Sequence, residues 1–448
     1  MQGEARYSFN VSTTAEVIKL VSGHGFKGAV DYVVSDSDGL NQSIGVEITL
    51  SAPAKDEEIE TPSDVSLRWL PLKDRLNRKH PEAYVCSIPT HENEIKGIVL
   101  SVSRLSTSVT SSLAKPIFTF QRGPPDHHHR DHHNRYYPPF YLPLLRPYDD
   151  VTPYVTAKVL VTIPRGHIEL GSFSSVFVGL TQNINGAFDE VVFKRLFICG
   201  ATSGLPNIEV GHASINAGAS PINGSFIVKD YLELITTKAP IDVDVTLLSN
   251  ATARYPTRLS LLNFNGSIDA DVKLVVYSST ADAKSNGSFA INALTTRAPV
   301  DVNITSLPSN AFLGLRAANR LAPVTASVPP SYEGGLVLVT TKGDSVVKVN
   351  KDTPDPEDKG RKRELNVRYI GGRIVAGSVK WVKSEKGAVA VEAKASKNND
   401  DDALDERKKH GPSEEGRDDS WEDPEDMILD RSKIDLVSTN ANVVLDLN

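Results

Sequence analysis

The sequence predicts an all-β protein built from repeated strand–turn–strand units, and two observations support this. First, short runs alternate apolar and polar residues, β-branched residues recur, and the 448 residues include only 2 Met. Alternation with period two is typical of half-buried strands, and β-branched side chains pack well on a pleated surface. Second, a ten-residue pattern recurs, because residues 236–245 match residues 295–304 at nearly every position.

The repeat indicates how the strands are assembled. Each close copy follows an Asn-Gly-Ser-Phe run, and looser copies lie at residues 261–272, 340–349 and 434–447. One such unit cannot bury its apolar face alone, whereas stacked units share a continuous core. The spacing between copies is uneven, so two architectures stay open: an elongated β-solenoid-like stack and a large β-sandwich.

Composition divides the chain into four regions. Residues 1–118 form an N-terminal β region, and residues 119–150 form a His-, Pro- and Tyr-rich loop or linker, because prolines remove donors from strand pairing. Residues 151–350 hold the repeats, and residues 351–448 supply strands that close the repeat fold. Charged inserts interrupt this last region at about 352–364 and 394–426. The acidic second insert has too few apolar groups to offset the entropy of ordering, so we expect a disordered loop.

Charge and hydropathy exclude two classes of partner. The net charge is −7, and no strand carries the dense basic stripe that grips phosphate backbones, so we expect no nucleic acid. The one basic cluster (Lys359, Arg361, Lys362, Arg363) lies beside Asp355, Glu357 and Asp358, and we interpret it as a solvated loop. No apolar stretch approaches the ~18 residues of a membrane-spanning helix, and the N-terminus lacks the apolar core of a signal peptide.

Histidines form the only cluster with metal-ligand chemistry. His127, His129, His132 and His133 could bind Zn²⁺, Ni²⁺ or Cu²⁺ through imidazole, with His128 between them. Structural zinc sites take ligands from two rigid elements, and this run lies in a proline-rich loop. We therefore expect no functional metal site, and these histidines remain weak candidates.

Asn-X-Ser/Thr sequons indicate glycosylation of a surface protein or tight turns. Three of the seven, at Asn223, Asn265 and Asn286, read Asn-Gly-Ser before an apolar residue, which a hairpin turn explains. The remaining four are the glycosylation candidates: Asn10, Asn41, Asn250 and Asn303. The two cysteines, Cys86 and Cys199, do not form a disulfide framework, although one bridge stays open.

Motifs for catalysis or cofactor binding do not emerge. The run at residues 23–28 fits G-x-G-x-x-G, but a strand follows it, so the helix N-terminus of a nucleotide site is missing. Five aspartates alternate with apolar residues and would share one strand face: Asp242, Asp244, Asp269, Asp271 and Asp301. Paired carboxylates could serve glycoside hydrolysis, but we expect a polar outer face. The prediction is therefore no enzyme, no catalytic residues and no cofactor.

The units that start at Thr236, Thr295 and Thr340 resemble the putative-adhesin repeat-β domains, above all their uncharacterised relatives in basidiomycete fungi. Residues 15–22, 83–86 and 159–164 resemble the same group, so the likeness covers most of the chain outside residues 119–150 and the charged inserts. The resemblance implies a fold type and weakly favours the cell surface. The family has no established catalytic residues to carry over. Its members often have an N-terminal membrane anchor, which this sequence does not show.

These observations predict a non-enzymatic structural or interaction protein, adhesin-like and associated with the cell surface. Its partners would be other copies of itself or surface glycans. Two alternatives stay open: a carbohydrate-binding or carbohydrate-active protein that uses the Asp-lined face, and an intracellular scaffold whose acidic insert recruits partners. An aromatic strip beside the aspartates would favour the carbohydrate alternative.

Overall fold

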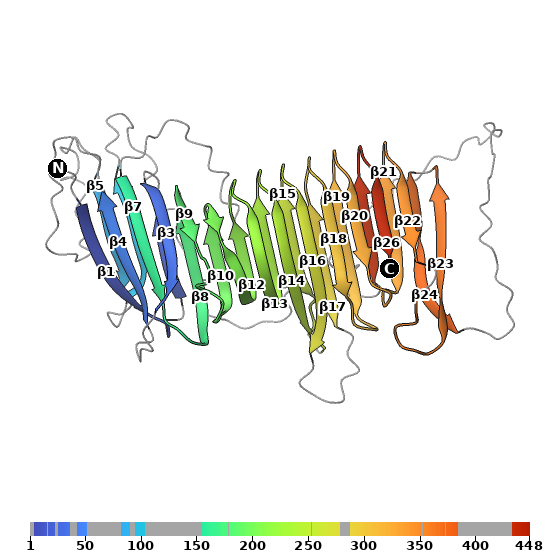
Figure 1. Cartoon of the computed structure of the whole chain (residues 1–448), viewed down its shortest axis with the longest axis horizontal. Coiled ribbons are helices and arrows are strands. Elements are labelled where there is room, and N and C mark those ends of the chain that lie inside the picture. The colour runs from blue at the N-terminus through green and yellow to red at the C-terminus, as the bar shows by residue number, and fades with distance from the viewer. Residues whose placement is uncertain are drawn as a thin grey trace, which may run out of the picture. The chain divides into compact units, whose positions relative to one another are not determined.

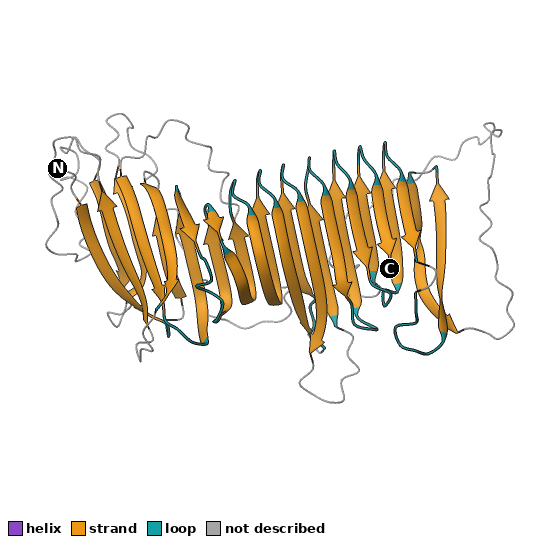
Figure 2. Ribbon diagram, in the orientation of Figure 1, coloured by secondary structure: helices purple, strands orange, loops and turns teal. Residues whose placement is uncertain are grey.

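A computed structural model describes most of the chain outside the expected linker and acidic insert. It covers residues 4–15, 17–22, 26–35, 43–51, 82–89, 95–103, 155–177, 179–251, 253–277, 287–350, 353–371, 373–383 and 432–448. These residues form strands and turns without any helix, which confirms the all-β prediction (Figure 2). The expected linker at 119–150 and the acidic insert at 394–426 lie outside the described residues.

Internal contacts divide the chain into two compact units. The first contains residues 1–164 and 174–183, and the second contains residues 165–173 and 184–448. Strands of the first unit are β1 (Glu4–Ser12), β2 (Val17–Ser22), β3 (Phe26–Val34), β4 (Ser43–Ser51), β5 (Glu82–Pro89), β6 (Ile95–Ser103), β7 (Val155–Ile163) and β9 (Leu180–Asn183). Strand β8 (Ile168–Phe177) begins in the second unit and ends in the first. The four regions expected from the sequence stay predictions.

The first unit contains a mixed sheet. Strand β4 pairs antiparallel with β1 and β7, and β3 pairs parallel with β7 and β9. Alternate residues of β4, such as Val46 and Ile48, are buried with Val161 of β7. Polar groups are buried in this unit as well: the Tyr32 hydroxyl contacts Ser175 and donates to the Gln182 side chain at 3.2 Å. Burial raises the pKa of Tyr32, so this hydroxyl stays neutral and acts as a structural hydrogen-bond donor.

The second unit holds the repeats. Its strands are β10 (Val191–Cys199), β11 (Thr202–Ser203), β12 (Leu205–Asn216), β13 (Ile222–Thr236), β14 (Ile241–Asn250), β15 (Thr257–Asn263), β16 (Ile268–Tyr277), β17 (Ser288–Leu294), β18 (Val300–Ser306), β19 (Phe312–Asn319), β20 (Val324–Val328), β21 (Gly334–Thr340), β22 (Ser345–Val349), β23 (Arg361–Ile370), β24 (Ile374–Lys383), β25 (Lys433–Ser438) and β26 (Val443–Leu447).

From β14 to β22, successive strands alternate between two sheets of parallel strands (Figure 1). In the first sheet, the end of β13 is followed by β15, β17, β19, β25 and β21. In the second sheet, the start of β13 is followed by β14, β16, β18, β20, β26 and β22. From β14 to β22 a strand therefore pairs with a strand of the next coil and not with its sequence neighbour, whereas β12, β13 and β14 pair in sequence. The strand–turn–strand units form a solenoid-like stack, whose two sheets enclose the core as in a sandwich.

Side-chain alternation explains this core. In β14 the residues Ile241, Val243, Val245 and Leu247 are buried, while the residues between them face outward. Strands of both sheets repeat this pattern, so each coil adds a layer of branched side chains to one continuous interior.

Polar side chains link each turn to the next, which explains the recurring threonines. We call these residues the turn spine: Thr236, Asn263, Thr295, Asn319, Ser438 and Thr340. Each ends a strand of the first sheet, except Thr295, which directly follows β17. Each side chain donates a hydrogen bond to a backbone oxygen in the turn of the adjacent coil; the acceptors are those of Gly218, Ala239, Gly266, Ala298, Ala322 and Ala441. The spine satisfies turn carbonyls that pairing between strands does not reach.

The expectation of hairpin turns at Asn-Gly-Ser was wrong. Residues 223–225 lie inside β13, where Gly224 has φ +157° and a Cβ would meet the Leu205 oxygen at 1.8 Å. Residues 265–267 do form a turn, but this turn joins two sheets and not two paired strands. Glycine is required for close approach between coils. Asn286 lies outside the described residues.

The spatial order of the coils differs from their order in the chain. Residues 432–448, which we call the inserted coil, place β25 between β19 and β21, and β26 between β20 and β22. Figure 1 shows these strands in dark red among the orange strands of residues 312–349. The similarity of residues 434–447 to the repeats therefore reflects a complete extra coil.

Candidate functional site

The outer face of the second sheet carries two rows of polar side chains in register. One row aligns Asp242 of β14, Asp269 of β16 and Asp301 of β18. Two residues further along each strand, Asp244, Asp271 and Asn303 form the second row. We call these six residues the acid face. Neighbouring strands lie about 4.8 Å apart, so the face presents carboxylates at a regular, closely spaced interval.

Strand alternation places these carboxylates outward. Asp242 and Asp244 are exposed, whereas Ile241, Val243 and Val245 around them are buried. A shift of one residue in register would bury the carboxylates and expose the core, so pairing in this register is strongly specified. The structure thus brings together all five aspartates that the sequence predicts for one face.

Proximity alters the charge of this face. Partial burial and then the neighbouring Asp242 and Asp271 raise the pKa of Asp269 above its ordinary value. Burial, Asp269 and Asp271 raise the pKa of Asp301 in the same way. Asn303 relieves the crowding in the second row, because its Nδ2 donates to Asp271 Oδ1 at 2.7 Å. The acid face is therefore an anionic surface whose carboxylates repel one another, and it favours positively charged neighbours.

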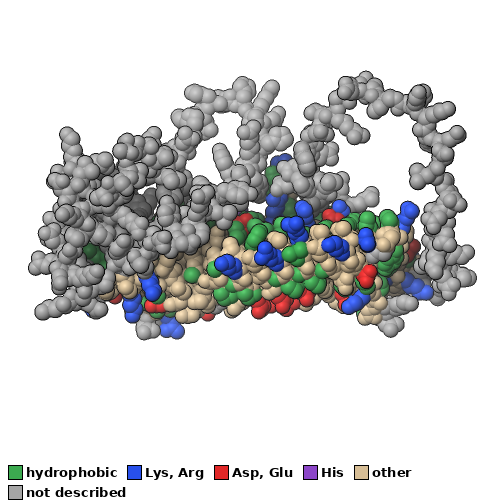
Figure 3. All heavy atoms as spheres, turned by 90° about the horizontal axis from the view of Figure 1, so that it is seen from above, with side chains coloured by type: hydrophobic (Ala, Val, Ile, Leu, Met, Phe, Trp, Pro, Cys, Tyr) green, Lys and Arg blue, Asp and Glu red, His purple; other side chains and the backbone are tan. Residues whose placement is uncertain are grey.

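Basic side chains occupy the turns beside the acid face. Lys238, Arg297, Arg320 and Lys342, which we call the turn ridge, are exposed on the turns between the two sheets. In Figure 3, which looks onto the turns, Lys and Arg spread along the visible face, while Asp and Glu gather along its lower margin. The second unit thus presents opposite charges on adjoining surfaces. Sequence reasoning missed this ridge, although Lys238, Arg297 and Lys342 are the third residues of the Thr-Thr-Lys/Arg copies. Arg320 follows Asn319 and has no such signal.

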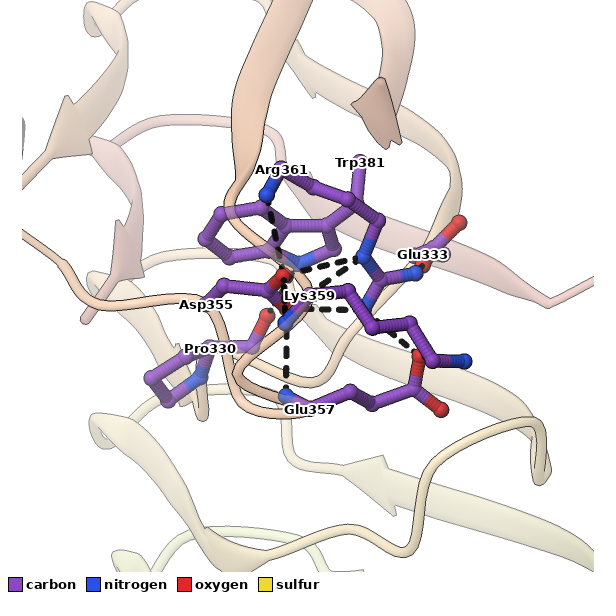
Figure 4. Close-up of polar contacts among 7 residues, drawn as sticks. All are labelled: Pro330, Glu333, Asp355, Glu357, Lys359, Arg361 and Trp381. Carbon is purple, nitrogen blue, oxygen red and sulfur yellow. Dashed lines mark hydrogen bonds and ion pairs between the residues drawn. The ribbon is translucent and has the colours of Figure 1, made fainter. Parts of the chain in front are cut away.

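A third cluster lies at the end of the stack, where β23 and β24 pair antiparallel and β24 pairs antiparallel with β21. Figure 4 shows Arg361 between carboxylates and the Trp381 ring. Its Nη2 lies 2.8 Å from Asp355 Oδ1 and 2.8 Å from Glu357 Oε2, and its guanidinium lies 5.8 Å from the Trp381 ring centroid. Hydrogen bonds from Arg361 lower the pKa of Asp355.

This cluster corrects part of the expectation of a solvated loop and charged insert at residues 352–364: residues 353–360 do form a loop and Lys359 is exposed, but Asp355 and Arg361 are not solvated. Arg361 and Asp355 side chains are only 17% and 5% exposed, and residues 361–364 begin strand β23. Trp381 Nε1 also donates to the Pro330 oxygen at 3.0 Å. Alternating charges of β23 allow an edge strand, since charged edges resist pairing with other chains. We interpret the cluster as a structural cap of the first sheet.

Other predicted residues are scattered. Asn10 is exposed on β1, Asn250 is half-buried at the end of β14, and Asn303 belongs to the acid face. Burial raises the pKa of the Cys199 thiol. Asn41 and the histidines His127, His128, His129, His132 and His133 lie outside the described residues, as does the side chain of Cys86. Glycosylation at the four candidate asparagines stays a prediction.

One of the comparisons with known proteins matches the repeat coils specifically. A family model described as a domain of unknown function, DUF7330, matches residues 212–352, the coils from β12 to β22. Among solved structures, a putative cell adhesion protein from Clostridium sporogenes is 9% identical, with a TM-score of 0.12 and 100% of both chains covered. That similarity is too low to support an argument. None of the curated proteins matches the chain. Within the described residues there is no helix long and apolar enough to cross a membrane.

Proposed function

We propose that this chain is a non-enzymatic structural or interaction protein, adhesin-like and associated with the cell surface, whose coil stack is the working surface. The supporting observation is the in-register alignment of outward side chains, seen where Asp242, Asp269 and Asp301 fall in one row. A rigid face with a regular repeat can meet a repetitive partner at several points at once. Such multivalency converts weak single contacts into strong attachment.

The alternative of a carbohydrate-binding protein gains no support from this face. Outward residues that continue the two rows are Asn223, Ser225, Thr325, Ser327, Val444 and Asp446. None of them is aromatic, and flat aromatic side chains are what a sugar-stacking surface would need. An interaction through charge and shape fits the face better.

Adhesion of coated beads to cells of the source organism tests the proposal. Beads that carry the whole chain should be retained under flow well above beads that carry an unrelated acidic protein. A variant with asparagine at Asp242, Asp244, Asp269, Asp271 and Asp301 should lose most of this retention, because the face loses its charge. A matched variant with glutamine at the four turn-ridge residues controls for general charge effects. Retention no better than the unrelated protein would refute the proposal.

A further inference from the structure

The inserted coil occupies a slot that is built for it on both sides. In the first sheet, Leu436 of the coil is in register with Ala317 of β19 and Leu338 of β21. In the second sheet, Leu445 is in register with Ala326 of β20 and Val347 of β22. The inward residues of the coil (Ile434, Leu436, Val443, Leu445 and Leu447) are completely buried. The slot therefore pairs with both edges of β25 and both edges of β26, and it buries their apolar side chains.

Turn contacts also fit the coil to the slot. Thr439 N donates to the Asn319 oxygen at 3.2 Å, and the Thr439 oxygen accepts from Thr341 N at 3.2 Å. Two glycines leave room for the coil: a Cβ on Gly334 would lie 2.4 Å from the Ser432 oxygen, and a Cβ on Gly343 would lie 2.4 Å from the backbone of Ala441. These glycines are explained by the coil, because both close approaches are to its backbone.

The inserted coil is joined covalently to the rest of the chain only through the long segment that follows β24. The flanking coils are joined directly by residues 329–333, which lead from β20 to β21 without passing through the inserted coil. Residues 384–431 separate β24 from the coil, and about 48 residues can reach ~160 Å when fully extended. The connection between β20 and β21 therefore does not depend on the inserted coil, and residues 384–431 are numerous enough to span the distance to a neighbouring molecule.

We propose that the slot between β19/β20 and β21/β22 is a binding site for residues 432–448 as a separate ligand, and that a second copy of this chain can supply them. Binding is strand addition in two sheets at once, in which backbone hydrogen bonds give affinity and the inward apolar side chains give register. Exchange of the coil between copies yields swapped dimers or chains of molecules. The tether favours the molecule's own coil in dilute solution, so exchange requires high local concentration, as on a crowded surface.

A disulfide between two molecules tests the proposal. Arg316 of β19 is in register with Asp435 of the coil, and both face outward. Full-length R316C and D435C chains are mixed at high concentration, oxidised and analysed by mass spectrometry of the linked peptides. We expect an R316C–D435C link between chains. The control mixture of R316C and V337C chains should lack the corresponding link, because β25 separates the two strands. The R316C/D435C double variant, which should form the link within one chain, is the positive control. If it forms the link but the mixed single variants do not, the proposal is overturned.

A second measurement avoids engineered cysteines. A protease recognition sequence is placed between residues 394 and 426 of the whole chain, and after cleavage a dye-labelled peptide of residues 432–448 is added. We expect the dye to elute with the body in gel filtration and to be displaced by excess unlabelled peptide or by its Asp435→Asn form. The Leu436→Asp form should not compete, because it would bury a charge. No uptake of the peptide, or loss of the folded body on cleavage, would refute detachment. This assay measures only peptide binding to the slot, so a negative result would not bear on the proposed role of the outer face.

Discussion

Asp269 lies in the middle of the acid face, with Asp242 on one side, Asp301 on the other and Asp271 two residues along its own strand. Burial and the adjacent carboxylates raise its pKa, so the folded protein binds a proton at this group more tightly than the unfolded chain does. The stabilising contribution is complete below the ordinary pKa of about 4 and is lost as the pH rises through the folded-state pKa. At neutral pH the ionised group therefore destabilises the fold.

We expect Asp269→Asn to raise the free energy of unfolding at pH 7, by less than about 1 kcal/mol, because it removes like charges directly opposite each other. The gain should vanish near pH 3, where the carboxylates are protonated in both states. Urea denaturation at the two pH values measures this, with the exposed Asp189→Asn as the control. A gain of equal size at both pH values, or a loss at pH 7, would contradict the electrostatic account.

Several residue-scale features could be predicted from the sequence, and others could not. Alternation sufficed to place Asp242, Asp244, Asp269, Asp271 and Asp301 on one face, because the period of a strand is two. Alternation does not indicate which strands pair, so the row formed by Asp242, Asp269 and Asp301 could not be predicted. The hairpin interpretation of Asn223 and Asn265 failed for the same reason: Asn-Gly signals a turn or close approach, but not the partner of the strand.

Among the elements, the inserted coil differs most from expectation. Its sequence is close enough to the repeats to be identified as a further unit, and its turn spine residue Ser438 bonds to the Ala322 oxygen at 3.1 Å like the others. Its position between coils from earlier in the chain depends on contacts between residues about 100 positions apart, such as Thr340 and Ala441. Local sequence patterns do not encode such contacts. The only local traces are Gly334 and Gly343, and their role is visible only beside Ser432 and Ala441.

Two adjacent glycines provide a matched test of the slot. Gly334→Ala should lower the free energy of unfolding by roughly 1–3 kcal/mol, because its Cβ would lie 2.4 Å from the Ser432 oxygen and overpack the slot. Gly335→Ala should change it by less than about 0.5 kcal/mol, since its nearest neighbours would be 3.9 Å away. Thermal or chemical denaturation compares the two. Equal effects would mean that the inserted coil does not run beside Gly334.

In the whole molecule, the repeats and the added elements have different roles. Stacked coils supply a continuous core and aligned outer faces, which is why composition and periodicity were enough for the fold class. The β23–β24 cap and the inserted coil complete the far end of the stack, and Arg361, Asp355 and Trp381 fix the cap through an ion pair and a ring contact. The charged residues of that segment looked like an insert in sequence because their partners lie elsewhere in the fold.

The inserted coil is defined by the order β20–β26–β22 in the second sheet, where Ser327 is in register with Asp446, and Asp446 is in register with Lys348. Adjacent parallel strands place Cα atoms about 4.8 Å apart, within reach of a disulfide, whereas strands two apart, at about 9.6 Å, exceed the limit of about 7 Å. Oxidation of two double variants of the full chain, analysed by mass spectrometry, tests this order directly. The account predicts a disulfide in S327C/D446C and none in S327C/K348C. A bridge between residues 327 and 348, with none between 327 and 446, would show that β22 stacks directly on β20 and would contradict the inserted coil.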